Sequence, residues 1–200
     1  IDAYLLGRTY PDLSGLTPEL AESWEYTNDG RTLTLFLRKG VKFHDGTPLT
    51  AEDARFSDER VTNPPKGVLS PRFDYYNGII KGWEAVDPYT LRVTFQQPSA
   101  VGLQLLSQYF LPVYPKHVIE RDGNRRKTAI GAGPFKLKSV QPEVRYVFER
   151  NPDYFISGLP YIDEYVVVFI RDDATRFAAL RTGRIDGIDA AVRLAPADQA

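Results

Sequence analysis

The sequence predicts a mixed α/β globular fold, and three stretches of the chain carry this prediction. Residues 28–30 are a turn signal between two extended stretches, the second of which alternates apolar and polar side chains. A helix-start signal stands at Thr50. Residues 165–170 are almost continuously apolar, and a capping aspartate and a helical pattern follow them. Strands and helices are therefore expected to alternate along the chain.

The first predicted strands form a hairpin. The Asn, Asp and Gly of residues 28–30 tolerate the positive φ angles of a tight turn. In the strand expected at residues 32–38, leucines occupy every second position, so one face should be buried. Residues 18–23, just before Trp24, are predicted to form a short helical or turn segment.

The helix predicted after this hairpin runs from Thr50 to about Val61. The Thr50 hydroxyl can act as the N-cap, and Asp53, three residues later, approximates a capping box. Residues 78–97 predict a further strand after a turn at residues 87–88, because apolar side chains alternate there as well.

The second half of the chain is predicted to contain short helices, a hairpin, a buried strand and a last helix. Residues 101–108 form an apolar helix, and Pro115 starts another. Residues 135–148 form the hairpin. The apolar run at residues 165–170 indicates a strand buried on both faces. The last helix runs from a cap at Asp172 or Asp173 to about Thr182, where Gly183 ends it. Its inner side is expected to carry Phe177, Ala178 and Leu180.

Composition argues against several classes of partner. The chain has 25 basic and 26 acidic residues among 200, so nothing recommends a nucleic acid or an anionic membrane. No apolar run reaches the roughly 18 residues needed to span a bilayer. The absence of cysteine fits an exported protein, although many cytosolic proteins share it. Because the sequence also lacks methionine and a signal peptide, we interpret it as a segment of a longer protein.

Catalytic and metal-binding candidates are weakly supported. His44 and Asp45 could act as metal ligands, but the chain has two histidines and no cysteine, so His44 is predicted to be a turn residue with a solvated ring. Glu52 and Asp53 suit the first turn of a helix, where they complement the helix dipole without any catalytic role. No serine stands in a Gly-x-Ser-x-Gly motif. We therefore predict no catalytic residue, no metal and no cofactor.

The segment from Leu16 to Val61 resembles, almost residue for residue, the hallmark segment of family 5 extracellular solute-binding proteins, which are the peptide- and nickel-binding components of ABC importers. The matching residues are Pro18, 20–24, 29–30, 37–43, 45–48 and 51–53. Later stretches are similar to further landmarks of the family in the same order: KGWEAVDPYTLRVTFQQP, GAGPFKL, ERNPDYF and DATRFAALRTGRID. Where the family usually has Gly-Thr-Gly-Pro, residues 131–134 read Gly-Ala-Gly-Pro.

The resemblance implies a periplasmic-binding-protein type II-like fold with an extra domain, in a partial chain that lacks the second lobe. Residues 1–115 would form the extra domain of the peptide-binding branch, and residues 116–200 the middle portion of ligand-binding lobe one. The resemblance also implies a protein that is not an enzyme and is periplasmic or extracellular. Its expected partners are a peptide or related small solute and the permease subunits of an ABC importer. Contact with the membrane would come only through the permease or through a lipid anchor outside this segment.

The same resemblance brings two segments of the chain toward the ligand cleft. The expected ligand-binding residues are Arg72, Tyr75, Tyr76, Gln108, Tyr109 and Phe110. Aromatic faces accept apolar side chains and a guanidinium binds a carboxylate with two hydrogen bonds, which suits peptide recognition. Trp24 and Trp83 are assigned to the core. The alternatives are a nickel chelate, an oligosaccharide or an opine as ligand, a carboxylate-dependent hydrolase, and a structural or chaperone-like module.

Overall fold

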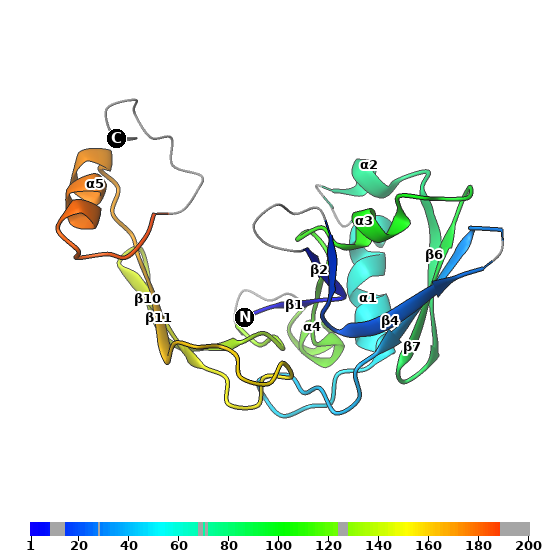
Figure 1. Cartoon of the computed structure of the whole chain (residues 1–200), viewed down its shortest axis with the longest axis horizontal. Coiled ribbons are helices and arrows are strands. Elements are labelled where there is room, and N and C mark those ends of the chain that lie inside the picture. The colour runs from blue at the N-terminus through cyan, green and yellow to red at the C-terminus, as the bar shows by residue number, and fades with distance from the viewer. Residues whose placement is uncertain (9–14, 28, 68–69, 71, 124–127, 189–200) are drawn as a thin grey trace.

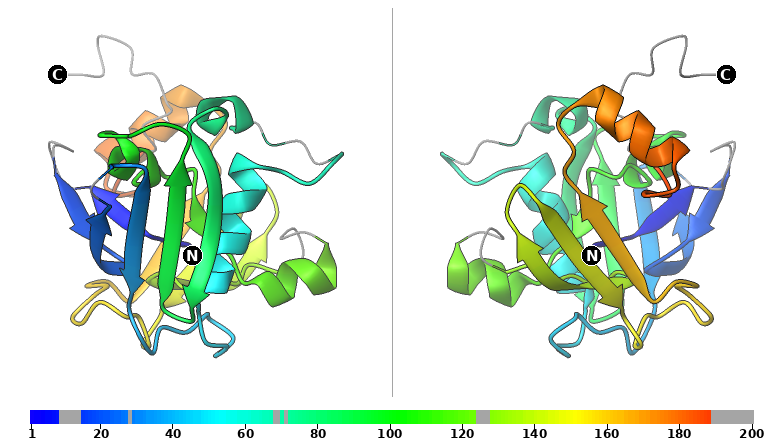
Figure 2. Two further views of the ribbon diagram at one scale, coloured as in Figure 1. Left: turned by 90° about the vertical axis from the view of Figure 1, so that its right-hand side faces the viewer. Right: turned by 90° about the vertical axis from the view of Figure 1, so that its left-hand side faces the viewer.

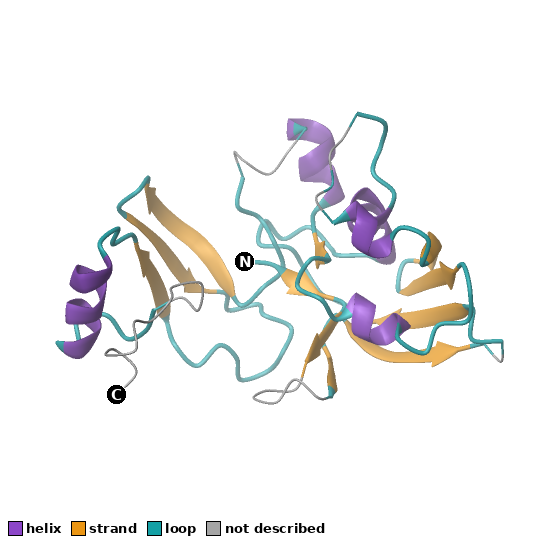
Figure 3. Ribbon diagram, turned by 90° about the horizontal axis from the view of Figure 1, so that it is seen from above, coloured by secondary structure: helices purple, strands orange, loops and turns teal. Residues whose placement is uncertain are grey.

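The structure is a computed structural model that describes residues 1–8, 15–27, 29–67, 70, 72–123 and 128–188. The chain forms a larger body up to residue 130 and a smaller arm from residue 135 (Figure 1). Residues 131–134 connect the two and are called the joint below. Seen from above, the strands of the arm lie apart from those of the body (Figure 3).

The core of the body lies between a four-stranded antiparallel sheet and one helix. The strands follow the order β4-β5-β7-β6 and are β4 (Ala21–Tyr26), β5 (Thr32–Leu37), β7 (Thr90–Phe95) and β6 (Ile80–Asp87). Helix α1 (Ala51–Thr62) contacts β6 and β7 and runs along one face of the sheet (Figure 2). The inward leucines of β5 are buried, as their alternation predicts. The expected hairpin is confirmed by the pairing of β4 with β5, although Asn28 of its turn lies outside the described residues.

Short elements close the rest of the body. Strand β1 (Ala3–Tyr4) pairs with β8 (Pro112–Val113), and β2 (Leu6–Arg8) pairs with β3 (Leu16–Pro18). The body also contains three short helices, α2 (Phe73–Tyr76), α3 (Gly102–Leu106) and α4 (Lys116–Asp122), of which α2 and α4 contact α1. No helix of the described residues is both long and apolar enough to cross a membrane.

The arm is a three-stranded antiparallel sheet followed by one helix. Its order is β11-β10-β9, with β9 (Phe135–Gln141), β10 (Arg145–Arg150) and β11 (Glu164–Val168). Helix α5 (Asp173–Arg181) begins after Asp172, whose Oδ2 accepts a hydrogen bond of 2.7 Å from the Thr175 amide. Both the hairpin and the cap therefore agree with the prediction.

The prediction for residues 18–23 is wrong. Instead of a helix or turn, the chain pairs Ala21 with Leu37 and continues as β4 to Tyr26. The local sequence Leu-Ala-Glu favours a helix, but pairing with β5 places Ala21 in the core. Tertiary contacts therefore override the local preference.

The prediction for residues 165–170 is also wrong. Strand β11 is an edge strand of the arm, and Tyr165, Val166 and Val168 are exposed. A continuous apolar run indicates that a strand favours burial on both faces, but burial also requires other elements to pack against those faces. In α5 the buried residues are Phe177 and Ala179, whereas the predicted Ala178 and Leu180 are exposed.

The core assignment is confirmed for Trp83, whereas Trp24 lies at the margin of the core. Trp83 is buried, and its Nε1 donates a hydrogen bond of 2.9 Å to Thr62 Oγ1 of α1. Trp24 is half-buried and packs against the same core. The bond from Trp83 therefore helps to fix the end of α1 against the sheet.

Candidate functional site

Four of the six residues predicted to face a ligand form one cluster, which we call the arginine–aromatic cluster: Arg72, Tyr75, Tyr109 and Phe110. The guanidinium carbon of Arg72 lies 3.8 Å from the ring centroid of Phe110. The Tyr75 ring meets Phe110 edge-on at 6.4 Å between centroids, and Tyr109 is tilted against Phe110 at 4.1 Å. Residues separated by more than thirty positions in the sequence are thus brought together.

Two tight turns present this cluster. Helix α2 is a single turn, closed by a hydrogen bond of 2.8 Å from the Asn77 amide to the Phe73 carbonyl, and Arg72 immediately precedes it. After α3, the Leu111 amide bonds the Gln108 carbonyl at 3.2 Å. Leu111 itself is buried, so the intervening aromatic residues are held at the surface.

The exposed atoms of the cluster are suited to binding a small solute. Tyr109 is 70% exposed and Tyr75 is 48% exposed. Such rings accept apolar groups on their faces. Phe110 covers one face of the exposed Arg72 guanidinium, which leaves the plane of its N–H groups uncovered by this ring. No carboxylate of the described residues forms an ion pair with Arg72.

The other two predicted residues take different positions. Tyr76 is fully buried, and its ring packs edge-on against Tyr75 at 5.0 Å between centroids, so it supports the cluster from below. Gln108 is half-buried, and its Nε2 donates a hydrogen bond of 3.1 Å to the Gln104 carbonyl. In this conformation the Gln108 amide is thus partly engaged within the body.

Asp58 of α1 is a buried residue that the sequence analysis did not single out. Its side chain is fully buried, and within the described part of the chain neither carboxylate oxygen has a hydrogen-bond partner. Burial raises the pKa of Asp58 well above its usual range. Burial also raises the pKa of Tyr76, and the nearby charge of Asp58 acts in the same direction. The sequence offers one signal for this burial: Asp58 stands four residues after Ala54, so both lie on the same face of the helix, and Ala54 is buried.

The histidines do not form the imagined metal site. The ring of His44 is half-buried, not solvated as predicted, and its Nε2 lies 3.0 Å from the Gly133 carbonyl oxygen. The neighbouring Asp45 turns away and places Oδ2 2.8 Å from His117 Nε2. Among the residues that the structure describes, no three His, Cys, Asp or Glu side chains are grouped as metal ligands would be.

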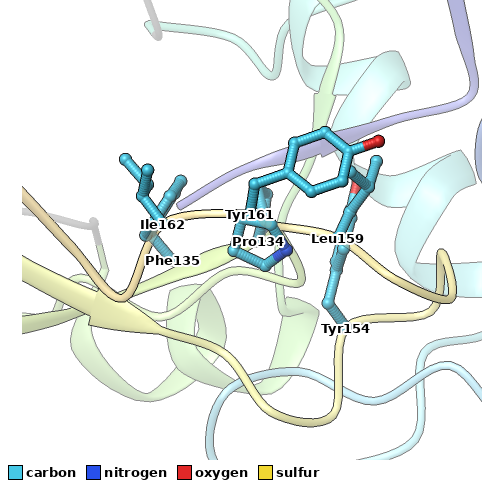
Figure 4. A pocket seen from close by; sticks show the side chains of 7 residues that line it. Pro134, Phe135, Tyr154, Leu159, Tyr161 and Ile162 are labelled. Atoms are coloured by element: carbon cyan, nitrogen blue, oxygen red, sulfur yellow. The ribbon is translucent and has the colours of Figure 1, made fainter.

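A second candidate is an open apolar pocket of about 360 Å³ beside the joint (Figure 4). It is lined by Pro134, Phe135, Tyr154, Leu159, Pro160, Tyr161 and Ile162. Ligand sites usually add several convergent polar groups to an apolar lining, and here the tyrosine hydroxyls are the only polar side-chain groups of the lining. The arginine–aromatic cluster, which offers both rings and a charge, is the better candidate for a solute.

Comparisons with known proteins agree on one family. The family model described as "Bacterial extracellular solute-binding proteins, family 5 Middle" matches residues 15–200. The glutathione-binding protein GsiB of Escherichia coli K12 is 30% identical over 181 residues, which are 87% of this chain and 35% of GsiB. The chain therefore spans about a third of the length of this curated relative.

Solved structures show the same likeness. DppA from Helicobacter pylori, in complex with the peptide STSA, has a TM-score of 0.78 and 34% identity over 92% of this chain and 40% of DppA. AgaA from A. tumefaciens R10, in complex with agropinic acid, has a TM-score of 0.83 and 31% identity over 92% of this chain and 37% of AgaA. The mixed α/β arrangement seen here is thus similar to part of each of these proteins.

Proposed function

The chain belongs to family 5 of the bacterial extracellular solute-binding proteins, and we propose that it is part of the binding component of an ABC importer. That component would capture a peptide or related small solute outside the cytoplasm and deliver it to the permease. The family consists of binding proteins, not enzymes. The match over residues 15–200 is the observation that carries this proposal.

The arginine–aromatic cluster is the part of this chain proposed to touch the solute. Peptides end in a carboxylate, glutathione is itself a small peptide, and agropinic acid is an acid, so the ligands of the relatives share this chemistry. The N–H groups of the exposed Arg72 side chain match a carboxylate, and Tyr75 and Tyr109 offer faces for apolar groups. A small solute with at least one carboxylate is therefore the proposed ligand class.

The division into an extra domain at residues 1–115 and a portion of ligand-binding lobe one at residues 116–200 is kept as a proposal. In the structure α4 still contacts α1, since the Lys116 amide bonds Asp53 Oδ1 at 3.1 Å. A second lobe outside this chain would close over the solute and exclude water. Backbone groups and ordered water would then supply most polar contacts.

Native mass spectrometry of the full-length protein, purified gently from its own host, tests the ligand class. Denaturation would release the bound solute for identification. Short peptides would support the peptide importer. A sugar or a metal chelate without a carboxylate contact would contradict the proposed ligand class while leaving the family intact.

Substitution of Arg72 tests the cluster. In the full-length protein we expect Arg72→Ala to weaken binding of the identified solute by about 10- to 100-fold, because a charge-assisted hydrogen bond is lost. Isothermal titration calorimetry measures this change. Arg60→Ala is the matched control, because Arg60 stacks on Phe56 of α1 at 5.5 Å and lies outside the cluster. Equal affinities of the wild type and Arg72→Ala would remove Arg72 from the site.

An opine-like acid is the second candidate ligand. It is favoured by the likeness to AgaA, whose structure contains agropinic acid. The same calorimetric series with a peptide and with such an acid distinguishes the two candidates. The tighter ligand of the pair identifies the branch of the family to which the full-length protein corresponds.

A further inference from the structure

The joint between the body and the arm is held by close backbone contacts. The Gly133 amide donates a hydrogen bond of 2.7 Å to the Ile1 carbonyl. A Cβ atom at Gly131 would lie 2.2 Å from the Ile1 oxygen, and one at Gly133 would lie 2.4 Å from the Asp2 oxygen. Glycine is therefore required at both positions, because any side chain would push the joint away from the first residues of the body.

His44 makes three hydrogen bonds to the joint. Its backbone amide donates to the Gly131 carbonyl at 2.8 Å. The Gly131 amide in turn donates to His44 Nδ1 at 3.3 Å, and His44 Nε2 lies 3.0 Å from the Gly133 carbonyl oxygen. Since Nδ1 accepts a hydrogen bond from the Gly131 amide, the neutral ring must carry its proton on Nε2, which donates a hydrogen bond to the Gly133 carbonyl. Both ring nitrogens are thus engaged by one short segment.

The arm contributes a second contact to the same carbonyl. Asn151, which follows β10 and is buried, donates from Nδ2 to the Gly133 oxygen at 3.1 Å. The backbone amide of Asn151 donates a hydrogen bond of 2.8 Å to the Pro134 carbonyl. The Gly133 carbonyl therefore connects His44 of the body with Asn151 of the arm.

We propose that His44 is an acid-sensitive latch that holds the arm to the body while its ring is neutral. Protonation would turn Nδ1 from an acceptor into a donor that faces the donating Gly131 amide. Two donors cannot share that contact, so the hydrogen bond is lost and the joint loosens. The connection to Gly133 through Nε2 remains possible, so the joint opens on one side and not throughout.

The surroundings of the ring favour its neutral form. Burial is the largest cause that lowers the pKa of His44 below its usual range, and the Gly133 carbonyl opposes it. Lys136 of β9 also lowers this pKa, whereas Asp2 raises it. The neighbouring Asp45 is engaged by His117. The latch is therefore closed at neutral pH and opens as the pH falls below the ordinary histidine range.

Hydrogen exchange in the full-length protein tests the latch. We expect the peptide that contains Gly131 to lose about tenfold in protection as the pH is lowered from about 7.5 to about 4, after correction for intrinsic exchange, because one hydrogen bond is broken. In His44→Asn and His44→Gln, which cannot titrate, this acid-dependent loss should be absent. His117→Gln is the matched control and should keep the wild-type profile, since His117 pairs with Asp45 and not with the joint.

Three outcomes would overturn the proposal. They are a flat wild-type profile, an acid-dependent loss that persists in His44→Asn, and a loss that disappears in His117→Gln. Nitrogen NMR of the imidazole rings in the wild-type protein gives a test that needs no variant. The His44 ring should carry its proton on Nε2 at neutral pH, and a proton on Nδ1 would exclude the latch.

Discussion

Asp58 shows how one residue can set the pH dependence of the whole body. Its carboxyl group is fully buried beside Tyr76, and the described residues offer it no hydrogen-bond partner. Charging such a group costs more than keeping it protonated, so its pKa rises. The folded protein then retains a proton that the unfolded chain releases above about pH 4. The contribution of Asp58 to stability is therefore present at low pH and is lost as the pH rises toward its folded pKa.

Asp58→Asn is expected to stabilise the protein at neutral and alkaline pH. The amide cannot ionise, so the free energy of unfolding should lose a dependence of up to about 1.4 kcal/mol per pH unit over this range. Urea unfolding at about pH 5 and pH 8 measures the change. Asp74→Asn is the control, because Asp74 is exposed on α2. The same pH dependence of the unfolding free energy in Asp58→Asn and in the wild type would show that Asp58 is ionised when folded.

The start of α1 depends on one buried carboxylate. Asp53 Oδ2 accepts hydrogen bonds of 3.0 Å from both the amide and the hydroxyl of Thr50. Its Oδ1 accepts from the Lys116 amide of α4 at 3.1 Å. The sequence predicted the bonds within the helix start, but the contact to α4 arises from the packing of the two helices. The residue thus caps α1 and ties it to a second element.

Asp53→Ala is expected to lower the free energy of unfolding by about 2–3 kcal/mol, because three donors lose their acceptor in a buried place. Glu52→Gln is the matched comparison on the same turn. Glu52 pairs mainly with Arg55 and also with Lys116, and these contacts lower its pKa to about 2. Its side chain is partly exposed, so the loss should stay below about 1 kcal/mol. Equal losses of unfolding free energy for Asp53→Ala and Glu52→Gln in chemical denaturation would contradict the larger role given to Asp53.

The whole chain presents its apolar surface unevenly. The body buries a large cluster of apolar side chains around the four-stranded sheet. On the arm, in contrast, many apolar side chains are exposed: Val140, Val144, Tyr161, Ile162, Tyr165, Val166, Val168, Phe169 and Leu180. An edge strand with exposed valines is a favourable place for another strand to pair. Among the residues that the structure describes, the arm is therefore the part that most needs a neighbour.

The 200-residue chain is expected to self-associate through the arm when it is produced as such. Val166→Lys with Val168→Lys should reduce this association, because lysines on one face of an edge strand oppose pairing. Sedimentation velocity over a range of concentrations measures the effect. Val86→Lys is the matched control, since Val86 is an exposed valine of β6 in the body. A wild-type chain that stays monomeric at every concentration would contradict the expectation.

The family resemblance pointed to part of the candidate site, and the packing of the chain supplied the rest. The resemblance to a family pointed to two segments around Arg72 and Phe110. In the structure the guanidinium carbon of Arg72 lies 3.8 Å from the ring centroid of Phe110. The resemblance could not indicate that Tyr76 would be buried below them, because burial depends on where α2 meets α1. Asp58 was equally hidden, since an aspartate on a helix is ordinarily solvated.

Alternation, turn residues and helix caps act over a few positions, and they were enough to predict the hairpins, α1 and α5 from the amino-acid order. Contacts between distant segments followed different rules. Pairing with β5 turned Ala21–Tyr26 into a strand, and a lack of neighbours left β11 exposed. The partners of His44 lie almost ninety positions away in the joint, at 3.3 Å and 3.0 Å. Such contacts are decided when the chain packs, because burial and hydrogen bonding depend on what surrounds a residue in space.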